Sequence, residues 1–591
     1  MKKILLNTKL SKIYVLGSIL ISFLLLASYF SYAMFTVSKE KSNAISIVTG
    51  NLTYDLKVDG EEGNTLTVPS GTSIEFIVTL SNPNERIARF NFYYLDEIPA
   101  NVNVGYITDC ETNPLPGATG VNLESSESIG SSNKYKIMVE NNSSNEVVIE
   151  LGVRVGLDYN DLSLPSNGHL FTEYTNEPNA PELDTNMIAV KYENNNWVKA
   201  DISNANNDWY NYNEQKWANA VTVSSSTRES YKNASIGTIV NINDIETMWV
   251  WIPRYSYSIA SEDGTNYYGR KGCYLESEPT LALPGEIDIR FVSNDIKDRG
   301  NAKYITTGAR EYYTPDAFAF GDEELSGIWV GKFETSSSNP DASYGGGNTT
   351  ELDAMIKPNV TSWRNINVSN AFNVSLKMND EGNRYGLSST VDTHMMKNSE
   401  WAVVAYLSQS RYGKLGNENF TGVNKEIYQN KSNQFITGCS YGNPSNENTD
   451  YGCQYTYDID INGTGASTTG TIYGVYDMSG GAFEIVMGIY NNNLGNSGFI
   501  TMPEVRYYDK YTDTNISLAC NNRECLSHGL GEIAGWYNDA KNMITVTSPW
   551  VASSGYYYDT TDAGVFYFGR SNADASIYGS FRLSLNLGTI N

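Results

Sequence analysis

Residues 473–488 read YGVYDMSGGAFEIVMG, and this stretch decides the fold that the sequence predicts. Apolar and aromatic side chains stand on both sides of Ser479-Gly480-Gly481, whose two glycines let the backbone turn sharply. The pattern therefore predicts a short strand, a tight turn and a second strand. Glu484 is the one carboxylate in the apolar run after the turn. A buried carboxylate has to be hydrogen-bonded or paired with a positive charge, so Glu484 needs a partner elsewhere in the chain.

The stretch resembles the GLYDMxGNVWEW signature of the formylglycine-generating-enzyme-like branch of the C-type lectin fold. Phe483 and Ile485 stand where that family has Trp, and Gly481 stands where it has Asn. The resemblance implies an α+β C-type-lectin fold over residues 246–591, in which Glu484 braces the loop core. Five further segments follow the family's order: 248–253 (MWVWIP, the opening strand), 327–335 (GIWVGKFET, a strand), 362–364 (SWR, the start of the first helix), 399–401 with the following AVVAYLSQS (a helix) and 580–583 (SFRL, the closing strand).

The composition indicates a globular, exported protein with an acidic surface. The chain has 591 residues, of which 40% are hydrophobic, and this is enough apolar material for two or three domains with cores of their own. The formal net charge is −26 and the isoelectric point is about 4.6. Such a charge repels a polyanion, so nucleic acid is excluded as a partner.

Residues 1–36 have the pattern of an export segment. Four lysines within the first 12 residues precede residues 13–36, which carry no charge. A basic region before an apolar run is typical of a secretory signal peptide, and Ser31-Tyr32-Ala33 offers small residues for cleavage. The apolar run is also long enough to span a bilayer, so a cleaved signal peptide and a retained membrane anchor both stay open. In either case the basic flank places the bulk of the chain outside the cell.

Residues 32–56 (YAMFTVSKEKSNAISIVTGNLTYDL) resemble the start of the camelysin and biofilm-matrix-fibre family. Phe35, Asn43 and Gly50-Asn51-Leu52 match that family, whereas its acidic residue after Phe35 is missing here. The resemblance implies an extracellular protein, displayed on the cell surface of a Gram-positive bacterium.

Residues 37–180 predict an all-β domain, an antiparallel β-sandwich. Runs of alternating apolar and polar residues recur there, and turn residues such as Asp59-Gly60 separate them. No cluster of titratable side chains in this region has the form of a reactive site. We therefore interpret it as a spacer that holds the C-terminal region away from the cell. The runs are 52–58, 73–80, 135–139 and 146–151.

Residues 181–245 predict a small aromatic β-rich module packed on the lectin-like domain. A disordered linker would not carry so many large rings. Two interpretations stay open: an exposed aromatic platform for sugars, and packing in a core, which is commoner. The rings are Trp197, Trp209, Tyr210, Tyr212 and Trp217.

The sequence offers little for catalysis. Its six cysteines form no CxxC pair, and the short spacings of Cys439/Cys453 and Cys520/Cys525 favour disulfides, with free buried thiols as the alternative. The formylglycine-generating enzymes bind copper through two cysteines near the C-terminal end, and this chain has no Cys after Cys525. The HxxxHxE triad of the related iron sulfoxide synthases is also absent. We therefore predict that the protein is not an enzyme and needs no catalytic cofactor.

A partial calcium motif occurs at residues 458–463 (DIDING), which have the D-x-D-x-N-G spacing of a calcium loop. Side-chain oxygens of Asp458, Asp460 and Asn462 would converge on the cation. The acidic residue expected at the twelfth position is Thr469 instead. One interpretation is a structural calcium ion, and the other is a plain polar turn.

Residues 551–582 (VASSGYYYDTTDAGVFYFGRSNADASIYGSFR) contain no Lys, Glu, Gln, Met or Trp. Tyr with small residues is the composition of antibody paratopes, because Tyr gives contact area at a low entropic cost. The segment resembles the variable region of C-type-lectin proteins that are diversified by retroelements. Adenine-directed mutagenesis acts there mostly on AAY codons, and the resulting codons cannot encode the missing residue types. The alternative is an ordinary Tyr-rich strand–loop–strand that closes the fold.

These patterns predict a surface-displayed binding protein, adhesin-like or receptor-like, whose C-terminal face binds an unidentified protein or glycan. Val565, Phe566, Phe568, Phe581 and Leu583 are expected to hold the scaffold. The alternatives are a degenerate enzyme of the formylglycine-generating-like branch and a structural surface or fibre subunit. The membrane is a partner through residues 1–36 if that segment stays uncleaved. The expected contact residues are Tyr556, Tyr558, Asp559, Asp562, Tyr567, Gly569, Arg570, Ser571, Asn572, Asp574, Ser576, Ile577, Tyr578 and Gly579.

Overall fold

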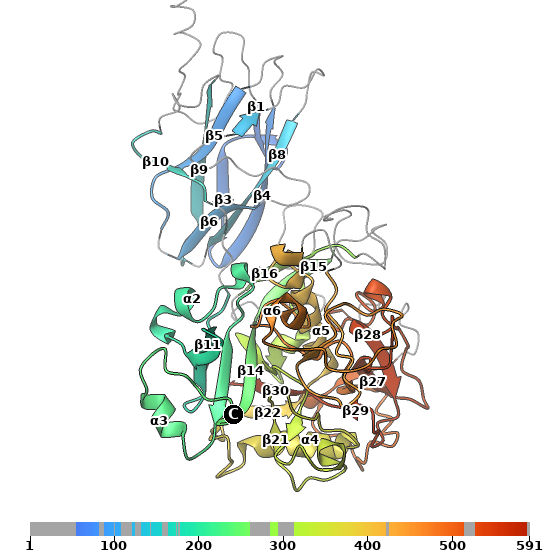
Figure 1. Ribbon diagram of the computed structural model, residues 1–591. Helices are drawn as coiled ribbons and strands as arrows, with labels where there is room; N and C mark the ends of the chain where they lie inside the picture. The colour runs from blue at the N-terminus through green and yellow to red at the C-terminus, as the bar shows by residue number, and fades with distance from the viewer. Residues whose placement is uncertain are drawn as a thin grey trace, which may run out of the picture. The chain divides into compact units, whose positions relative to one another are not determined.

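The computed structural model is mostly β-sheet with few helices, as the sequence predicts (Figure 1). No helix in the described part of the chain is long and apolar enough to cross a membrane. The predicted export segment 1–36 lies outside the described residues, as do Cys110, Cys273, Cys520 and Cys525. The structure describes residues 55–81, 88–99, 101–107, 121–123, 132–141, 143–156, 164–172, 174, 178–259, 284–292, 313–420, 425–512 and 526–587.

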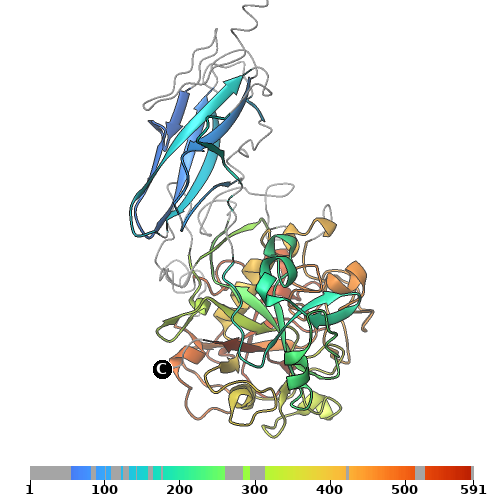
Figure 2. The same cartoon turned by 90° about the vertical axis from the view of Figure 1, so that its left-hand side faces the viewer.

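The chain falls into two compact units that divide between Thr175 and Asn176. The N-terminal unit has two antiparallel sheets, ordered β2-β1-β4-β8-β6 and β10-β5-β9-β3, with β7 paired to β5. The two sheets lie against each other (Figure 2). Alternate residues of both sheets, such as Val78 and Phe92, share one core, in agreement with the predicted sandwich. The strands are β1 (Asp55–Val58), β2 (Glu61–Glu62), β3 (Thr65–Val68), β4 (Thr72–Ser81), β5 (Ala88–Leu95), β6 (Val102–Ile107), β7 (Val121–Leu123), β8 (Ser132–Asn141), β9 (Val147–Gly156) and β10 (Gly168–Leu170).

The C-terminal unit contains a seven-stranded sheet, ordered β12-β11-β13-β14-β19-β30-β22. β13 and β14 are hydrogen-bonded neighbours, so this sheet joins strands from both sides of residue 245. Residues 181–245 are therefore not a module of their own, because backbone hydrogen bonds make them part of the larger unit. The strands are β11 (Ile188–Glu193), β12 (Asn196–Lys199), β13 (Asn219–Val223), β14 (Ile245–Pro253), β19 (Gly327–Gly331), β22 (Asp392–Met395) and β30 (Leu583–Asn586).

The aromatic side chains of residues 181–245 pack in the core. Trp197, Trp209, Tyr210, Tyr212 and Trp217 are at most 4% exposed, and all belong to the core of the C-terminal unit. The indole N–H of Trp217 donates a hydrogen bond of 2.8 Å to a backbone carbonyl, as a buried polar group requires. The sugar-platform interpretation is therefore wrong for these rings, and the core-packing interpretation is confirmed.

A second large sheet, ordered β26-β25-β27-β28 with β29 beside β25, contains the end of the signature stretch. Residues 473–482 are irregular, with turns and bends, instead of the predicted first strand, and the strand begins at Phe483. The predicted turn is present, since φ is +74° at Gly480 and +73° at Gly481. A Cβ on Gly481 would lie 2.5 Å from the carboxylate oxygen Oε1 of Glu334, which explains glycine at this position. The strands are β25 (Phe483–Tyr490), β26 (Asp509–Tyr511), β27 (Trp550–Ser554), β28 (Gly564–Ser571) and β29 (Gly579–Ser580).

The two longest described helices pack against these sheets. The predicted helix after Ser399 is confirmed as α5 (Asn398–Ser408), which is buried along its whole length. The predicted helix start at residues 362–364 is wrong. Those residues are not helical, and α4 (Val368–Leu376) begins later, where the side chain of Asn367 accepts a hydrogen bond from the backbone of Asn370. Shorter described elements are α2 (Ala205–Asp208), α3 (Arg228–Asn233), α6 (Asp460–Thr464), β15 (Tyr255–Ile259), β16 (Ile287–Phe291), β17 (Ala319–Phe320), β18 (Glu323–Glu324), β20 (Ser336–Ser337), β21 (Ala354–Met355), β23 (Cys439–Ser440) and β24 (Tyr455–Thr456).

Glu484 has the charged partner that its burial requires. Its carboxylate is fully buried and accepts two hydrogen bonds from Arg582, at 2.9 Å from Nε and 2.5 Å from Nη2. Arg582 also donates to the carbonyls of Gly331 in β19 and Tyr476 in the signature turn, at 2.8 and 2.9 Å. One guanidinium therefore joins β25, β19, the signature turn and the closing segment of the chain.

Two further carboxylates, Glu334 and Asp477, lie in the same buried region as the Arg582–Glu484 pair. Burial raises the pKa of Glu334 well above its ordinary value, and the charges of Asp477 and Glu484 add to this effect. Burial likewise raises the pKa of Asp477, although Arg582 opposes the shift, and it raises the pKa of Glu484 to about 7. Burial and the repulsion among these carboxylates therefore raise their pKa values, and the charge of Arg582 opposes the shifts.

A second buried ion group holds β22 to the start of α5. The ring of His394 lies between two carboxylates, with Nδ1 at 2.6 Å from Asp392 and Nε2 at 3.0 Å from Glu400. Burial alone would lower the pKa of His394, but Glu400 and Asp392 outweigh it and raise the pKa to about 9. Burial would raise the pKa of Glu400, but the imidazolium outweighs it and lowers the pKa to about 2.

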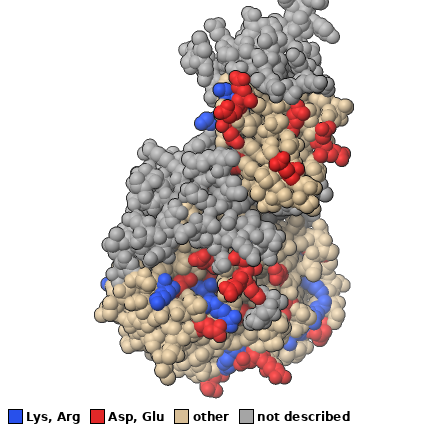
Figure 3. Space-filling view, turned by 180° about the vertical axis from the view of Figure 1, so that it is seen from behind, with Lys and Arg blue, Asp and Glu red and all other residues tan. Residues whose placement is uncertain are grey.

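Charge on the surface is predominantly acidic, in keeping with the net charge of −26. Asp and Glu side chains are spread over both units on the face drawn in Figure 3, with Lys and Arg between them.

Replacing Arg582 with Met should lower the free energy of unfolding of the C-terminal unit by about 3–5 kcal/mol, because it leaves a buried carboxylate without its partner. The double variant R582M/E484L should recover part of this loss, since both charged groups are then gone. All ten Trp residues lie in the C-terminal unit, so Trp fluorescence during urea unfolding measures this unit alone. Equal losses in the single and double variants would contradict the coupling.

Replacing His394 with Gln should cost most stability at low pH. The folded pKa of about 9 exceeds the ordinary value of 6.5, so protonated His394 stabilises the fold fully below pH 6.5 and loses this effect as the pH rises to 9. The difference in unfolding free energy between wild type and H394Q should therefore shrink from pH 6 to pH 9, as measured by urea unfolding. A difference that grows with pH would contradict the charged state of His394.

Candidate functional site

The C-terminal segment 551–582 forms the last strands of the second sheet and two loops between them. β27 and β28 are antiparallel neighbours (Figure 1), and β29 pairs with β25. Residues 555–563 connect β27 to β28, and residues 572–578 connect β28 to β29. This segment therefore closes the fold, and its loops rise from strands that are anchored in the core.

Burial separates the expected scaffold residues from the expected contact residues. Val565, Phe566, Phe568, Phe581 and Leu583 are at most 1% exposed and belong to the core. Of the contact residues, Tyr558, Asp562, Arg570, Asp574, Ile577 and Tyr578 are exposed, whereas Tyr556, Asp559, Tyr567, Ser571, Asn572 and Ser576 are half-buried.

Gly569 and Gly579 do not belong among the contact residues. Both are buried, and each lies in a strand, where it allows a ring to pack closely. A Cβ on Gly579 would lie 2.8 Å from the ring of Phe483, and a Cβ on Gly569 would lie 2.5 Å from the ring of Tyr567. These two glycines are therefore structural.

The structure does not gather all contact residues at one place. Tyr556, Tyr558 and Tyr578 form one group, in which the ring of Tyr556 lies 6.1 Å from that of Tyr558 and 5.3 Å from that of Tyr578. At the far end of β28, Arg570 donates to the carbonyl of Met543, and the carbonyl of Asn572 accepts from the backbone of residue 496. The three tyrosines are therefore the centre of the candidate site.

Aromatic rings from outside the C-terminal segment complete this group. The ring of Tyr557 lies nearly perpendicular to those of Phe435 and Tyr451, at 5.0 and 5.4 Å. Tyr451 also stacks on Tyr558 at 5.3 Å. Tyr558 itself is 54% exposed, so the cluster reaches the surface.

A disulfide holds the loop that carries Tyr451. Cys439 and Cys453 are bonded, with their Cα atoms 5.2 Å apart, so the predicted pair is confirmed. The second predicted pair, Cys520/Cys525, lies outside the described residues. The closed loop of residues 439–453 limits the positions open to Tyr451, which stands two residues before Cys453.

Arg364 fixes the loop 572–578 against the rest of the unit. Its Nη1 donates a hydrogen bond of 2.6 Å to the carbonyl of Ile577, and its guanidinium carbon lies 3.7 Å from the centroid of the Phe435 ring. Burial lowers the pKa of Arg364 from its ordinary value. The backbone of Asn365 adds a hydrogen bond of 2.8 Å to the carbonyl of Ser576.

Tyr344 is a second exposed ring near Arg364, whose guanidinium carbon lies 5.7 Å from its centroid. Tyr344 has φ of +61° and is 42% exposed. A bulky residue in the left-handed region is strained, and such residues cluster at functional sites. No local sequence pattern marks Tyr344, Phe435, Tyr451 or Arg364 as part of this site, because each is distant in sequence from residues 551–582.

The residues of the predicted calcium loop make local hydrogen bonds at the start of α6. Asp460 accepts a hydrogen bond of 2.8 Å from the backbone of Asn462, and Asp458 accepts one of 2.8 Å from the hydroxyl of Thr456. Among the residues that the structure describes, no group of three or more His, Cys, Asp and Glu is arranged to hold a metal ion. This geometry agrees with a polar turn, and the calcium ion stays a prediction.

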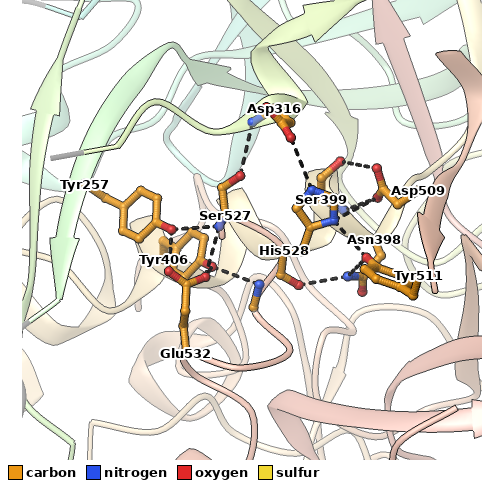
Figure 4. A network of polar contacts seen from close by, with 11 residues as sticks. Tyr257, Asp316, Asn398, Ser399, Tyr406, Asp509, Tyr511, Ser527, His528 and Glu532 are labelled. Atoms are coloured by element: carbon orange, nitrogen blue, oxygen red, sulfur yellow. Dashed lines mark hydrogen bonds and ion pairs between the residues drawn. The ribbon is translucent and has the colours of Figure 1, made fainter. Parts of the chain in front are cut away.

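A buried polar network lies between β15, α5, β26 and residues 526–532 (Figure 4). Glu532 is 2% exposed and accepts hydrogen bonds from the hydroxyls of Tyr257 and Tyr406 and from the backbone of Ser527. Burial raises the pKa of Glu532, although these donors oppose the shift. Side-chain hydroxyls and a backbone amide of the protein itself therefore hold the Glu532 carboxylate in place.

His528 extends this network towards β26. Its Nδ1 lies 2.8 Å from the hydroxyl of Tyr511 and its Nε2 lies 3.5 Å from Asp316 (Figure 4). The side chain of Asn398 donates to the His528 carbonyl, and Asp509 accepts from the backbone of Ser399 at 2.6 Å. The network therefore connects the start of α5 with β26 and with the segment that carries His528.

Comparison with known proteins gives no family assignment. No protein-family model, curated protein or solved structure matches the chain. The interpretation of the site therefore depends on the residues and geometry of this chain itself.

Replacing Tyr558 with Ser and Tyr578 with Asn should leave the fold intact, with a loss of about 1 kcal/mol or less each, because the two residues are 54% and 41% exposed. Replacing Phe566 with Ala should cost about 3–5 kcal/mol, because its ring is buried. Urea unfolding followed by Trp fluorescence measures all three. If the Tyr variants lose as much stability as F566A, these tyrosines are core residues and the surface cannot be a variable binding face.

Proposed function

We propose that the chain is an exported protein, displayed on the surface of a Gram-positive bacterium, that binds a ligand through its C-terminal face without catalysis. The observation that carries this proposal is the division within residues 551–582. Apolar side chains such as Phe566 and Phe568 are buried, whereas the two loops expose Tyr558, Asp562, Asp574 and Tyr578. A rigid frame with exposed Tyr-rich loops is what a paratope requires.

The proposed fold of the C-terminal unit is of the C-type-lectin type, in its formylglycine-generating-enzyme-like branch. Support comes from sequence segments in the family's order, of which β14, β19 and α5 are regular elements at the expected places. The ion pair between Glu484 of the signature and Arg582 of the closing segment adds support, because it joins the two most characteristic segments.

The proposed source of diversity is a retroelement that rewrites codons 551–582. The absence of Lys, Glu, Gln, Met and Trp from this segment supports it, as does the placement of all its Asp residues on the two loops. Such loops tolerate substitution because few of their side chains contribute to the core.

The binding proposal can be tested with one pair of variants and one matched control pair. The variant Y558A/Y578A removes the two most exposed tyrosines of the C-terminal loops, and I500A/V505A removes two exposed apolar side chains elsewhere on the unit. Screening the full chain on glycan and protein arrays should yield a ligand. Its affinity should fall about tenfold or more in Y558A/Y578A, as for central aromatic anchors, and stay unchanged in the control.

Equal affinity in wild type and Y558A/Y578A, measured by surface plasmon resonance, would contradict this proposal. So would an equal loss in both variant pairs, because the effect would then not belong to the C-terminal loops.

A further inference from the structure

Four loop segments of the C-terminal unit form one continuous surface, which we call the tyrosine surface. It comprises residues 339–347, 439–453, 555–563 and 572–579. Each segment contributes an aromatic side chain, namely Tyr344, Tyr451, Tyr558 and Tyr578 in chain order. The first two segments lie outside the proposed variable region, so the surface is larger than residues 551–582.

Contacts between the segments show that they are neighbours. The disulfide-closed loop touches the segment 555–563 twice, since Tyr451 stacks on Tyr558 and the hydroxyl of Ser445 donates to the carbonyl of Thr560. Arg364 joins the other two segments, because it lies beside the ring of Tyr344 and bonds the carbonyl of Ile577. The four loops are thus held in fixed positions, which lowers the entropic cost of binding.

The charges of the tyrosine surface all have one sign. Its four segments contain six carboxylates and no Lys or Arg. The carboxylates are those of Asp341, Glu447, Asp450, Asp559, Asp562 and Asp574, and all but Asp559 are exposed.

Two basic side chains, Lys431 and Arg364, lie close to the surface and offset only part of the charge of its six carboxylates. Lys431 is fully buried, and its ammonium group donates to the side chain of Asn446 and the carbonyl of Asn448. The guanidinium of Arg364 lies against Phe435 and is bonded to a carbonyl. The exposed charge that a ligand meets is therefore negative.

We infer that the tyrosine surface binds a polypeptide whose contact region is rich in Lys and Arg. This inference rests on the proposed binding function and names the class of its ligand. Complementary charge favours a cationic partner and repels acidic glycans, nucleic acid and anionic lipid. The Tyr, Ser and Asn side chains of the four loops supply rigid contact area and adaptable hydrogen bonds, which suits a protein surface.

The test selects peptides from a random 12-residue phage-display library on the immobilised full chain, with removal of phage that also bind Y558A/Y578A. The selected peptides should contain more Lys and Arg than the input library. One variant, E447Q/D450N, neutralises two exposed carboxylates of the surface. The control variant, E214Q/E381Q, neutralises two exposed carboxylates elsewhere on the same unit.

Synthetic versions of the selected peptides should bind E447Q/D450N about fivefold or more weakly than wild type. Their affinity for E214Q/E381Q should change by less than about twofold. Both variants lose two negative charges, so this difference would show that the charges near the peptide, and not the net charge of the protein, set the affinity. Peptides without an excess of Lys and Arg would overturn the inference, and so would equal effects of the two variants. If such peptides still require Tyr558 and Tyr578, the proposed binding function stands.

Recovery of a neutral glycan and of no peptide would overturn the polypeptide class while keeping a binding face. Recovery of no ligand that depends on the two tyrosines, from either the peptide library or the glycan array, would overturn both the inference and the proposed function.

Discussion

The buried ion pair between Arg582 and Glu484 is the interaction on which the C-terminal unit depends. Removing two charges from water is offset only when they pair closely and their other hydrogen-bonding groups are satisfied. Here Arg582 also donates to carbonyls of β19 and of the signature turn, from segments as far as 251 residues away in sequence. The signature strand, the main sheet and the end of the chain must therefore meet at one point for this group of bonds to form.

That constraint fixes the frame beneath the candidate binding surface. β25 carries Glu484 and lies between β27 and β29, from which the two C-terminal loops rise. The rings of Phe566 and Phe568 fill the core below the loops, and Arg364 and the Cys439–Cys453 disulfide hold the neighbouring segments. Exposed side chains on the loops can therefore differ in chemistry without much effect on the fold, as a recognition surface requires.

Negative charge has different roles in the interior and on the surface of this protein. In the interior, Glu484 is matched with Arg582 and Glu400 with His394, and Glu532 is surrounded by hydroxyl and amide donors. On the tyrosine surface the carboxylates have no Lys or Arg from the same segments beside them. Interior carboxylates without partners would destabilise the fold, whereas exposed ones cost little and favour a cationic ligand.

The sequence by itself determined that β14, β19 and α5 are regular elements, because apolar runs have to be buried, and that Glu484 needs a partner. The sequence also predicted that Phe566 and Phe568 belong to the scaffold and that Tyr558 and Tyr578 are contact residues on the surface. Only the tertiary structure decided that the partner is Arg582, 98 residues away, since no local pattern encodes pairing over that distance. It also decided that residues 473–482 are irregular rather than a strand, and that Tyr344 and Tyr451 join the surface. These features depend on packing between segments that are remote in sequence. Local sequence patterns carry no information on such packing.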